Sequence, residues 1–302
     1  MPFDLSNWMG LVSDTKLLSE LTIPGTHDSG ARYIDPTVYK TRNSPRLTTQ
    51  TAGIREQLDS GIRFLDIRVG YTNGRFLLYH ENAFENLGFA DVRNICSEFL
   101  TAHPRETIIL SLKKEDDAPS GNNAKDVTFE DRFNEFVRTS RKDLWYLANA
   151  IPTLKDVRGK IVLYRRFALD EGTTNLGINA FDGYTTASGG ATFTLEGPSR
   201  PKLRIQDEYG QLSTSKASKY TAIEKVLAEA VAPGHRDVLY VNYASAAGVV
   251  PVDFPLSVAN YINPRLITYF NAHKKGRFGI IAMDFQTAEL NTLIAGTNPG
   301  VG

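Results

Sequence analysis

Short apolar runs alternate with longer amphipathic stretches along most of the chain. The runs are rich in β-branched and aromatic residues, which is typical of buried strands, and the stretches carry apolar residues at helical spacing. The predicted strands cover residues 17–23, 63–69, 76–80, 107–112, 160–164, 203–207, 238–243 and 279–283. The predicted helices cover residues 54–62, 92–100, 129–137, 220–230 and 258–270, with a short last helix from about Thr287.

Glycine and proline punctuate this pattern at three informative places. Pro24-Gly25 is expected to stop the first strand, so that His27 and Asp28 lie on the loop that follows it. Asn73-Gly74 predicts a two-residue hairpin between the second and third strands. Pro264 is expected to interrupt the helix over 258–270. Residues 168–200, rich in Gly, Thr and Asn, receive no element.

The order of elements predicts the fold class. About eight buried strands, most of them followed by a helix, are the pattern of an α/β protein with a (β/α)8 barrel. The hairpin makes its two strands antiparallel, so we expect an irregular barrel. The chain of 302 residues shows no internal repeat, linker or low-complexity segment, and we expect one domain over residues 1–302.

Composition excludes some classes of function. Lys+Arg and Asp+Glu are both 34, so no net field favours nucleic acid or an anionic membrane, and phosphate recognition would need a local basic cluster. The single cysteine, Cys96, excludes an intramolecular disulfide and is predicted to be a core thiol. No apolar run approaches the roughly 18 residues of a membrane span. Residues 1–4 lack the start of a signal peptide, so we expect either a cytoplasmic protein or a mature form without its leader.

Polar residues suited to chemistry gather where the apolar strands finish. A charge at one strand end is usually only solvated, but in a barrel the carboxyl ends of the strands converge on a single mouth. The hairpin is the exception, because it would place two of the ends at opposite rims unless its register compensates. The candidate site residues are His27, Asp28, Asp66, Arg68, His80, Lys113, Arg166, Asp207, Tyr209 and Asp284.

Two imidazoles beside arginine and lysine side chains indicate phosphoryl transfer. One imidazole can act as base and the other as acid, and a guanidinium matches phosphate oxygens with two hydrogen bonds. A carboxylate against each imidazole would set its tautomer. Metal ligation is the competing interpretation, with His27, Asp28, Asp66 and His80 as the ligands. Arg68 and Lys113 would place positive charge in the same pocket, so we favour a site without metal or other cofactor.

Several segments together resemble the bacterial phosphatidylinositol-specific phospholipases C, whose catalytic X-box fold recurs in eukaryotic phosphoinositide phospholipases. The most specific segment is Ile23-Pro24-Gly25-Thr26-His27-Asp28-Ser29-Gly30. Further segments follow in the family's order at residues 64–68, 111–115, 159–163, 206–209 and 261–264. The resemblance covers nearly the whole chain and implies an irregular (β/α)8 barrel.

The resemblance implies a role for each catalytic candidate. His27 would be the base that removes the proton of the inositol 2-hydroxyl, held by Asp284. His80, assisted by Asp28, would protonate the departing diacylglycerol oxygen. The first product would be inositol 1,2-cyclic phosphate, with slow hydrolysis to inositol 1-phosphate as a second step.

The resemblance also implies how the substrate is held. Arg68 would stabilise charge on the phosphoryl oxygens, with Asp66 beside it as support. Some relatives use calcium and carry an acidic residue where this chain has Arg68, which places the chain with the metal-independent group. One departure is Glu81, since the acid histidine of the family is usually followed by glycine. The implied inositol-binding residues are Lys113, Arg166, Asp207 and Tyr209.

A lipid substrate implies contact with a membrane surface. We expect a secreted enzyme in its mature form without signal peptide, with a cytoplasmic enzyme as the other choice. Val249, Val250 and Val252 fit an exposed apolar loop at the rim, as do Val38 and Tyr39. We expect a monomer that binds no nucleic acid. Two alternatives stay open: a calcium-dependent phosphodiesterase on the same type of barrel, and a catalytically silent inositide-binding protein.

Overall fold

The computed structural model describes residues 3–32, 46–119, 127–139, 141–173, 175–184, 190–210, 215–246 and 254–302. Its strands are β1 (Thr22–Thr26), β2 (Phe64–Thr72), β3 (Arg75–His80), β4 (Ala83–Gly88), β5 (Ile108–Lys114), β6 (Trp145–Tyr146), β7 (Ile161–Arg166), β8 (Ile178–Asn179), β9 (Thr192–Gly197), β10 (Arg200–Gln206), β11 (Val238–Tyr243) and β12 (Gly279–Met283). The α-helices are α1 (Ile54–Asp59), α2 (Phe89–Ala102), α3 (Phe129–Thr139), α4 (Leu154–Val157), α5 (Lys216–Val231), α6 (Pro255–Ala272) and α7 (Ala288–Gly296). Three short 3-10 helices are η1 (Leu5–Leu11), η2 (Leu18–Glu20) and η3 (Lys142–Leu144).

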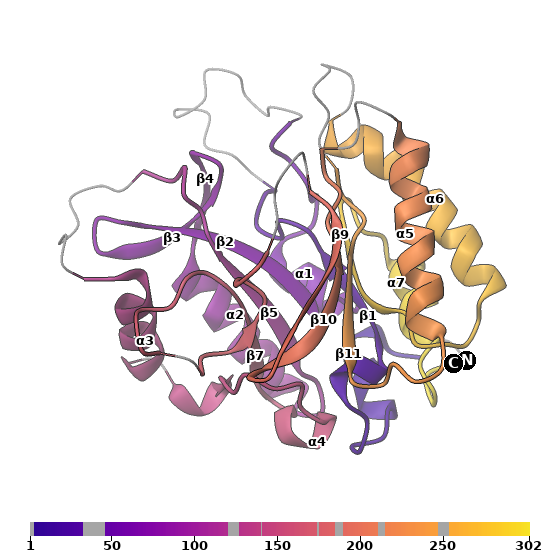
Figure 1. Ribbon diagram of the computed structural model, residues 1–302, viewed down its shortest axis with the longest axis horizontal. Helices are drawn as coiled ribbons and strands as arrows, with labels where there is room; N and C mark the ends of the chain where they lie inside the picture. Colours follow the sequence, from indigo (N-terminus) through magenta and orange to yellow (C-terminus); the bar gives the residue numbers. More distant parts are fainter. Residues whose placement is uncertain are drawn as a thin grey trace.

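The sheet curves around a central axis, with helices on its outer side (Figure 1). The strand order is β6-β7-β5-β2-β1-β12-β11-β10-β9, and all neighbours in it are parallel except β9 and β10. Within the described chain, no strand pairing joins β8 to β10. The Arg200 side chain bridges this gap by donating to the carbonyls of Asn179 and Asp182. The fold is therefore the predicted irregular (β/α)8 barrel, left open between two strands.

All eight predicted strands are present, and those over 238–243 and 279–283 have the predicted bounds. The six-residue strands β4 and β9 and the two-residue strands β6 and β8 were not predicted. β8 and β9 lie within residues 168–200, the stretch to which the sequence assigned no element. β6 and β8 have only two residues each, which is too short for a periodic pattern to be recognised.

The prediction for the first strand was wrong in its extent. η2 occupies part of it, and β1 continues through Pro24 and Gly25 instead of stopping there. The pairing of β1 with β2 begins only at Gly25, so the missing N–H of Pro24 removes no hydrogen bond between these two strands. The Pro24 carbonyl still accepts a hydrogen bond from the Arg63 amide. A Cβ on Gly25 would lie 2.8 Å from Cβ of Phe64, so glycine is required by close packing. His27 therefore follows the strand directly, its amide bonded to the Met283 carbonyl.

The predicted interruption at Pro264 was also wrong, because α6 runs through it. One face of this helix is a continuous apolar stripe packed into the core, formed by Val258, Ile262, Leu266 and Phe270. A proline inside a helix costs about 3 kcal/mol, which burial of several large side chains at about 2 kcal/mol each outweighs.

The hairpin decides where His80 lies. Asn73 and Gly74 have φ of 50° and 80° and connect the paired residues Thr72 and Arg75, as the Asn-Gly pair predicts. β2 extends past the barrel before it turns, and Figure 1 shows the β2–β3 hairpin reaching outward. Val69 pairs with Leu78, so the return strand brings His80 back to the level of the barrel mouth. The register thus compensates for the reversed direction of β3.

The core supports the expectation for Cys96. Its side chain is buried among the apolar residues between the sheet and α2, and burial raises the pKa of the thiol to about 12. In the described part of the chain, no helix is both long and apolar enough to span a bilayer.

A buried ion pair joins the N-terminal segment to the barrel. Arg63 Nε donates to Glu106 Oε2 at 2.8 Å, and both side chains are fully buried. The Glu106 carboxylate also accepts the amides of Met9 and Gly10, in η1. Burial lowers the pKa of Arg63, and the charge of Glu106 opposes that shift.

Replacing Glu106 by glutamine is expected to lower the free energy of unfolding by about 3–5 kcal/mol, because it leaves the guanidinium buried without its counter-charge. Denaturant titration measures the loss. The matched control is Glu135→Gln, which removes an exposed partner of Arg138 and should change stability by less than about 1 kcal/mol. Equal effects of the two variants would contradict this role for the buried pair.

Candidate active site

The first imidazole lies between a carboxylate and a guanidinium. His27 Nδ1 is 2.8 Å from Oδ1 of Asp284, which follows β12, and its Nε2 is 2.5 Å from Nη2 of Arg68. A guanidinium only donates, so Nε2 accepts, and Nδ1 therefore carries the hydrogen and donates it to Asp284. This tautomer presents an unprotonated nitrogen to the barrel mouth. His27 is thus arranged as a base.

The second imidazole, His80 at the end of β3, also has a carboxylate at Nδ1. Its Nδ1 lies 2.9 Å from the Leu47 carbonyl and 3.1 Å from Oδ2 of Asp28. A carbonyl and a carboxylate both accept, so Nδ1 carries the hydrogen and Nε2 is left for a substrate. Both imidazoles neighbour the same guanidinium–carboxylate group, so they lie at one rim of the barrel.

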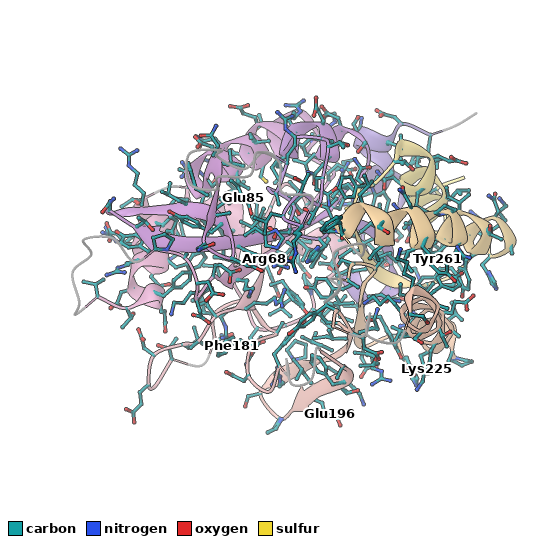
Figure 2. All side chains as sticks on the ribbon, turned by 90° about the horizontal axis from the view of Figure 1, so that it is seen from above. Arg68, Glu85, Phe181, Glu196, Lys225 and Tyr261 are labelled. Atoms are coloured by element: carbon teal, nitrogen blue, oxygen red, sulfur yellow. The ribbon has the colours of Figure 1, made fainter. Side chains whose placement is uncertain are left out.

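Arg68 connects the two histidines. Its Nη2 is 3.3 Å from Oδ2 of Asp66, and its Nη1 is 3.5 Å from Oδ2 of Asp28. Viewed from above, Arg68 lies near the middle of the molecule (Figure 2). Burial would lower the pKa of Arg68, but the charges of Asp28 and Asp66 raise it above its ordinary value. The guanidinium is therefore a permanent positive charge between the imidazoles.

Asp66 is the buried anchor of this group. Burial favours its neutral form, yet the charges of Arg68 and Arg166 lower its pKa below the ordinary value. Its oxygens accept from Ser111 Oγ at 3.0 Å and from the Asp28 amide at 3.2 Å. Asp28 itself has φ of 40°, a backbone conformation that is uncommon outside glycine and is held here by that bond.

The four residues considered above as metal ligands (His27, Asp28, Asp66 and His80) surround the Arg68 side chain. A cation bound by them would have to take the place of the guanidinium. No group of three or more His, Cys, Asp or Glu side chains in the described ranges is placed to hold a metal ion. The donor set therefore fits an arginine-centred site.

Three adjacent strands bring further cations to the same mouth. Arg68 of β2 pairs with Lys113 of β5, which pairs with Arg166 of β7. Burial lowers the pKa of Lys113, as do the neighbouring arginines, while its Nζ donates to Glu115 at 3.1 Å. The register alone thus assembles a row of positive charges.

The far side of the mouth carries the remaining candidates. Arg166 Nη1 donates to Oδ1 of Asp66 at 3.2 Å, and its Nη2 is 3.9 Å from Oδ2 of Asp207, which follows β10. Tyr209 is half-buried, and burial raises the pKa of its phenol. The charge of Asp207 raises this pKa further, and the charges of Arg68 and Arg166 lower it. All the predicted site residues therefore gather at one mouth.

Several site residues were not predicted. Ser111 precedes Lys113 by two positions, and the period of two along a strand could have identified it. Tyr243 accepts from Arg166 and ends a predicted strand, whereas Tyr184 donates to Asp207 from the unassigned stretch. Glu85 lies on the unpredicted strand β4, near Arg68 in Figure 2. The proposed membrane-contact residues Val38, Tyr39, Val249, Val250 and Val252 lie outside the described residues.

This geometry can perform one kind of chemistry well. A base and an acid face the same space, and a fixed guanidinium between them can stabilise a developing anion. Lysine, arginine and aspartate side chains beside it can bind a polyhydroxylated group. The arrangement suits displacement at phosphorus by a hydroxyl of the same substrate.

Comparison with known proteins gives consistent matches. Residues 21–167 match the family described as phosphatidylinositol-specific phospholipase C, X domain. The 1-phosphatidylinositol phosphodiesterase of Staphylococcus aureus (strain Newman) is 33% identical over 299 residues, covering 92% of this chain and 88% of that protein. The protein of that name from Listeria monocytogenes is 32% identical, covering 92% of this chain and 80% of its own length.

Solved structures agree. One is a structure of the phosphatidylinositol-specific phospholipase C from Staphylococcus aureus, solved in a study of the modulation of its membrane binding. It has a TM-score of 0.83 at 30% identity, and the match covers 98% of both chains. The phosphatidylinositol-specific phospholipase C of Listeria monocytogenes has a TM-score of 0.74 at 28% identity, covering 98% of this chain and 99% of that one.

Proposed function

The chain belongs to the phosphatidylinositol-specific phospholipase C family and acts as such an enzyme, and we propose that it releases diacylglycerol and inositol 1,2-cyclic phosphate without a metal ion. The observation that carries the proposal is the placement of the Arg68 guanidinium among two imidazoles, each of which has a carboxylate at Nδ1 and leaves Nε2 for the substrate. The steps below follow from the atoms that each side chain presents to the mouth.

In the first step His27 takes the proton of the inositol 2-hydroxyl. The hydroxyl would replace Arg68 as the donor to Nε2, and Asp284 stabilises the imidazolium that forms. The 2-oxygen attacks the neighbouring phosphorus, and the P–O bond to diacylglycerol breaks. His80 Nε2 gives its proton to the departing oxygen, and Asp28 stabilises the charged form that precedes this transfer. A later water could open the cyclic ester by the reverse roles, giving inositol 1-phosphate.

Arg68 supplies the electrostatic part of catalysis. Once released from His27, its fork can donate to two phosphoryl oxygens, where negative charge increases in the transition state. Asp66 holds the other side of the guanidinium in place. Because this positive charge cannot be lost near neutral pH, the reaction needs no cation at that position.

The row of side chains beyond Arg68 fits the inositol ring. Lys113 and Arg166 can donate to ring hydroxyls and Asp207 can accept from them, while the Tyr209 ring can lie against the apolar face of the sugar. In this proposal the two histidines transfer protons, and the row of side chains binds and orients the inositol ring.

The test is incubation of the protein with phosphatidylinositol vesicles in excess chelator, followed by phosphorus NMR. Cyclic phosphate as first product supports the proposal. Turnover only after calcium is added would support the calcium-dependent phosphodiesterase instead. Binding of the vesicles without turnover under any condition would support the silent inositide-binding protein.

Other properties also belong to the proposal. A substrate held in a bilayer requires action at a membrane surface, and a structural relative is described by its membrane binding. We propose one catalytic barrel over residues 1–302 that acts as a monomer. Secretion from the producing cell stays a prediction.

A further inference from the structure

A carboxylic acid that the mechanism does not use lies beside the acid histidine. Glu85 is only 3% exposed, and Asp28 is fully buried. None of the four carboxylate oxygens of the two residues receives a well-directed hydrogen bond from another group. A Cβ on Gly30 would lie 2.2 Å from Oε2 of Glu85, so the glycine leaves the space that this carboxyl group fills.

The carboxyl groups of Glu85 and Asp28 lie within hydrogen-bonding reach of each other. Two buried carboxylates so placed share a proton, because ionising both would place unpaired negative charge out of water. Asp28 is the one that keeps the charge, since Arg68 Nη1 and His80 Nδ1 lie 3.5 and 3.1 Å from its Oδ2. No salt bridge joins Glu85 to a cation within the residues described. The proton therefore belongs on Glu85.

We propose that Glu85 is a positioning residue: it stays a neutral carboxylic acid and donates its hydrogen to Asp28, which limits the negative charge that Asp28 presents to His80. This inference rests on the proposed function, in which His80 is the acid. A weaker negative partner leaves the His80 imidazolium a stronger acid for the departing oxygen.

The charges around this group agree with that assignment. Burial raises the pKa of Glu85 well above its ordinary value, the charges of Asp28 and Asp66 raise it further, and the charge of Arg68 opposes them. Two groups face Nδ1 of His80: the Asp28 carboxylate and the Leu47 carbonyl. Asp284 interacts with His80 from a greater distance.

Two substitutions separate a neutral from an ionised Glu85. Glu85→Gln keeps a neutral donor toward Asp28, so the pH profile of kcat/KM should keep its alkaline limb, with kcat within about threefold of wild type. Glu85→Leu removes the donor, so the alkaline limb should move up by about one pH unit and kcat should fall about tenfold. A downward move in both variants would show that a negative charge had been removed, and an unmoved limb in Glu85→Leu would show no coupling; either result overturns the proposal.

The matched control is Glu81→Gln. It removes a carboxylate next to His80 in sequence, but one that is exposed to solvent. Its alkaline limb should move by less than about 0.3 units because solvent screens the charge.

A readout without substrate keeps this inference separate from the function. A buried acid that stays protonated takes up a proton on folding, so it lowers stability progressively as pH rises above its unfolded pKa of about 4.3. The gain in Tm of Glu85→Gln over wild type should therefore widen from about pH 5 to about pH 8. A constant difference would overturn the proposal, whereas absence of phosphatidylinositol cleavage by wild type would instead reject the proposed function.

Discussion

His27→Ala is expected to reduce kcat by about 10⁴-fold while leaving the protein folded. Nδ1 of this imidazole is held by Asp284, and its Nε2 accepts from the Arg68 guanidinium, at the position where the substrate hydroxyl would donate. Without it the 2-hydroxyl must lose its proton to water, which is a far weaker base. Since the imidazole acts in the transition state, kcat and kcat/KM should fall together. Phosphorus NMR of phosphatidylinositol vesicles measures both.

The control for this variant is His273→Ala, which removes an exposed imidazole that stacks on Tyr269 at the end of α6. It should keep the activity of the wild type. Circular dichroism and the Tm check that both variants are folded. Near-full turnover by folded His27→Ala would reject the mechanism, because the mechanism assigns the base step to His27 and the acid step to His80.

Arg68→Asp is expected to lower kcat by about 10³-fold or more in excess chelator, and calcium should restore part of the loss. The substitution replaces the central positive charge by a third carboxylate next to Asp28 and Asp66. Three carboxylates repel one another and repel the phosphoryl group, so the variant needs a cation. Oxygen ligands of this kind suit calcium. Turnover with and without calcium, at fixed lipid, measures the effect.

The matched control is Arg55→Asp, which reverses the same charge on the surface of α1, where Arg55 pairs with Asp59. It should show neither the loss nor a response to calcium. Full activity of Arg68→Asp in chelator would show that the guanidinium is not needed at the phosphoryl group. A wild-type enzyme that itself required calcium would overturn the metal-independent proposal.

Both variants test the same structural fact, which is that three separate segments meet at Arg68. The turn after β1 supplies His27 and Asp28, the hairpin supplies His80, and the turn after β12 supplies Asp284. Because β1 pairs with both β2 and β12, these segments are neighbours in the sheet although they are far apart in sequence. The sheet therefore sets the distances on which acid–base catalysis depends.

Local patterns by themselves determined a large part of this protein. Alternating apolar runs and amphipathic stretches predicted eight of the strands, Asn73-Gly74 predicted the hairpin, and the residues at the strand ends predicted the site. These signals succeed because strand periodicity, turn geometry and residue chemistry depend on a few neighbouring residues. The same dependence explains why the predictions at Pro24 and Pro264 were wrong. Whether β1 continues through Pro24 is decided by the strand ladder, and whether α6 continues through Pro264 is decided by packing in the core.

Only the tertiary structure decided which side chains meet. The register of Val69 with Leu78 returned His80 to the mouth, and the register of Arg68 with Lys113 aligned the cations. The tertiary structure also buried Glu85, which lies on the unpredicted strand β4, against Asp28. Protonation depends on charges and burial supplied by distant segments, so the tautomer of an imidazole or the proton of a carboxyl follows from the folded barrel.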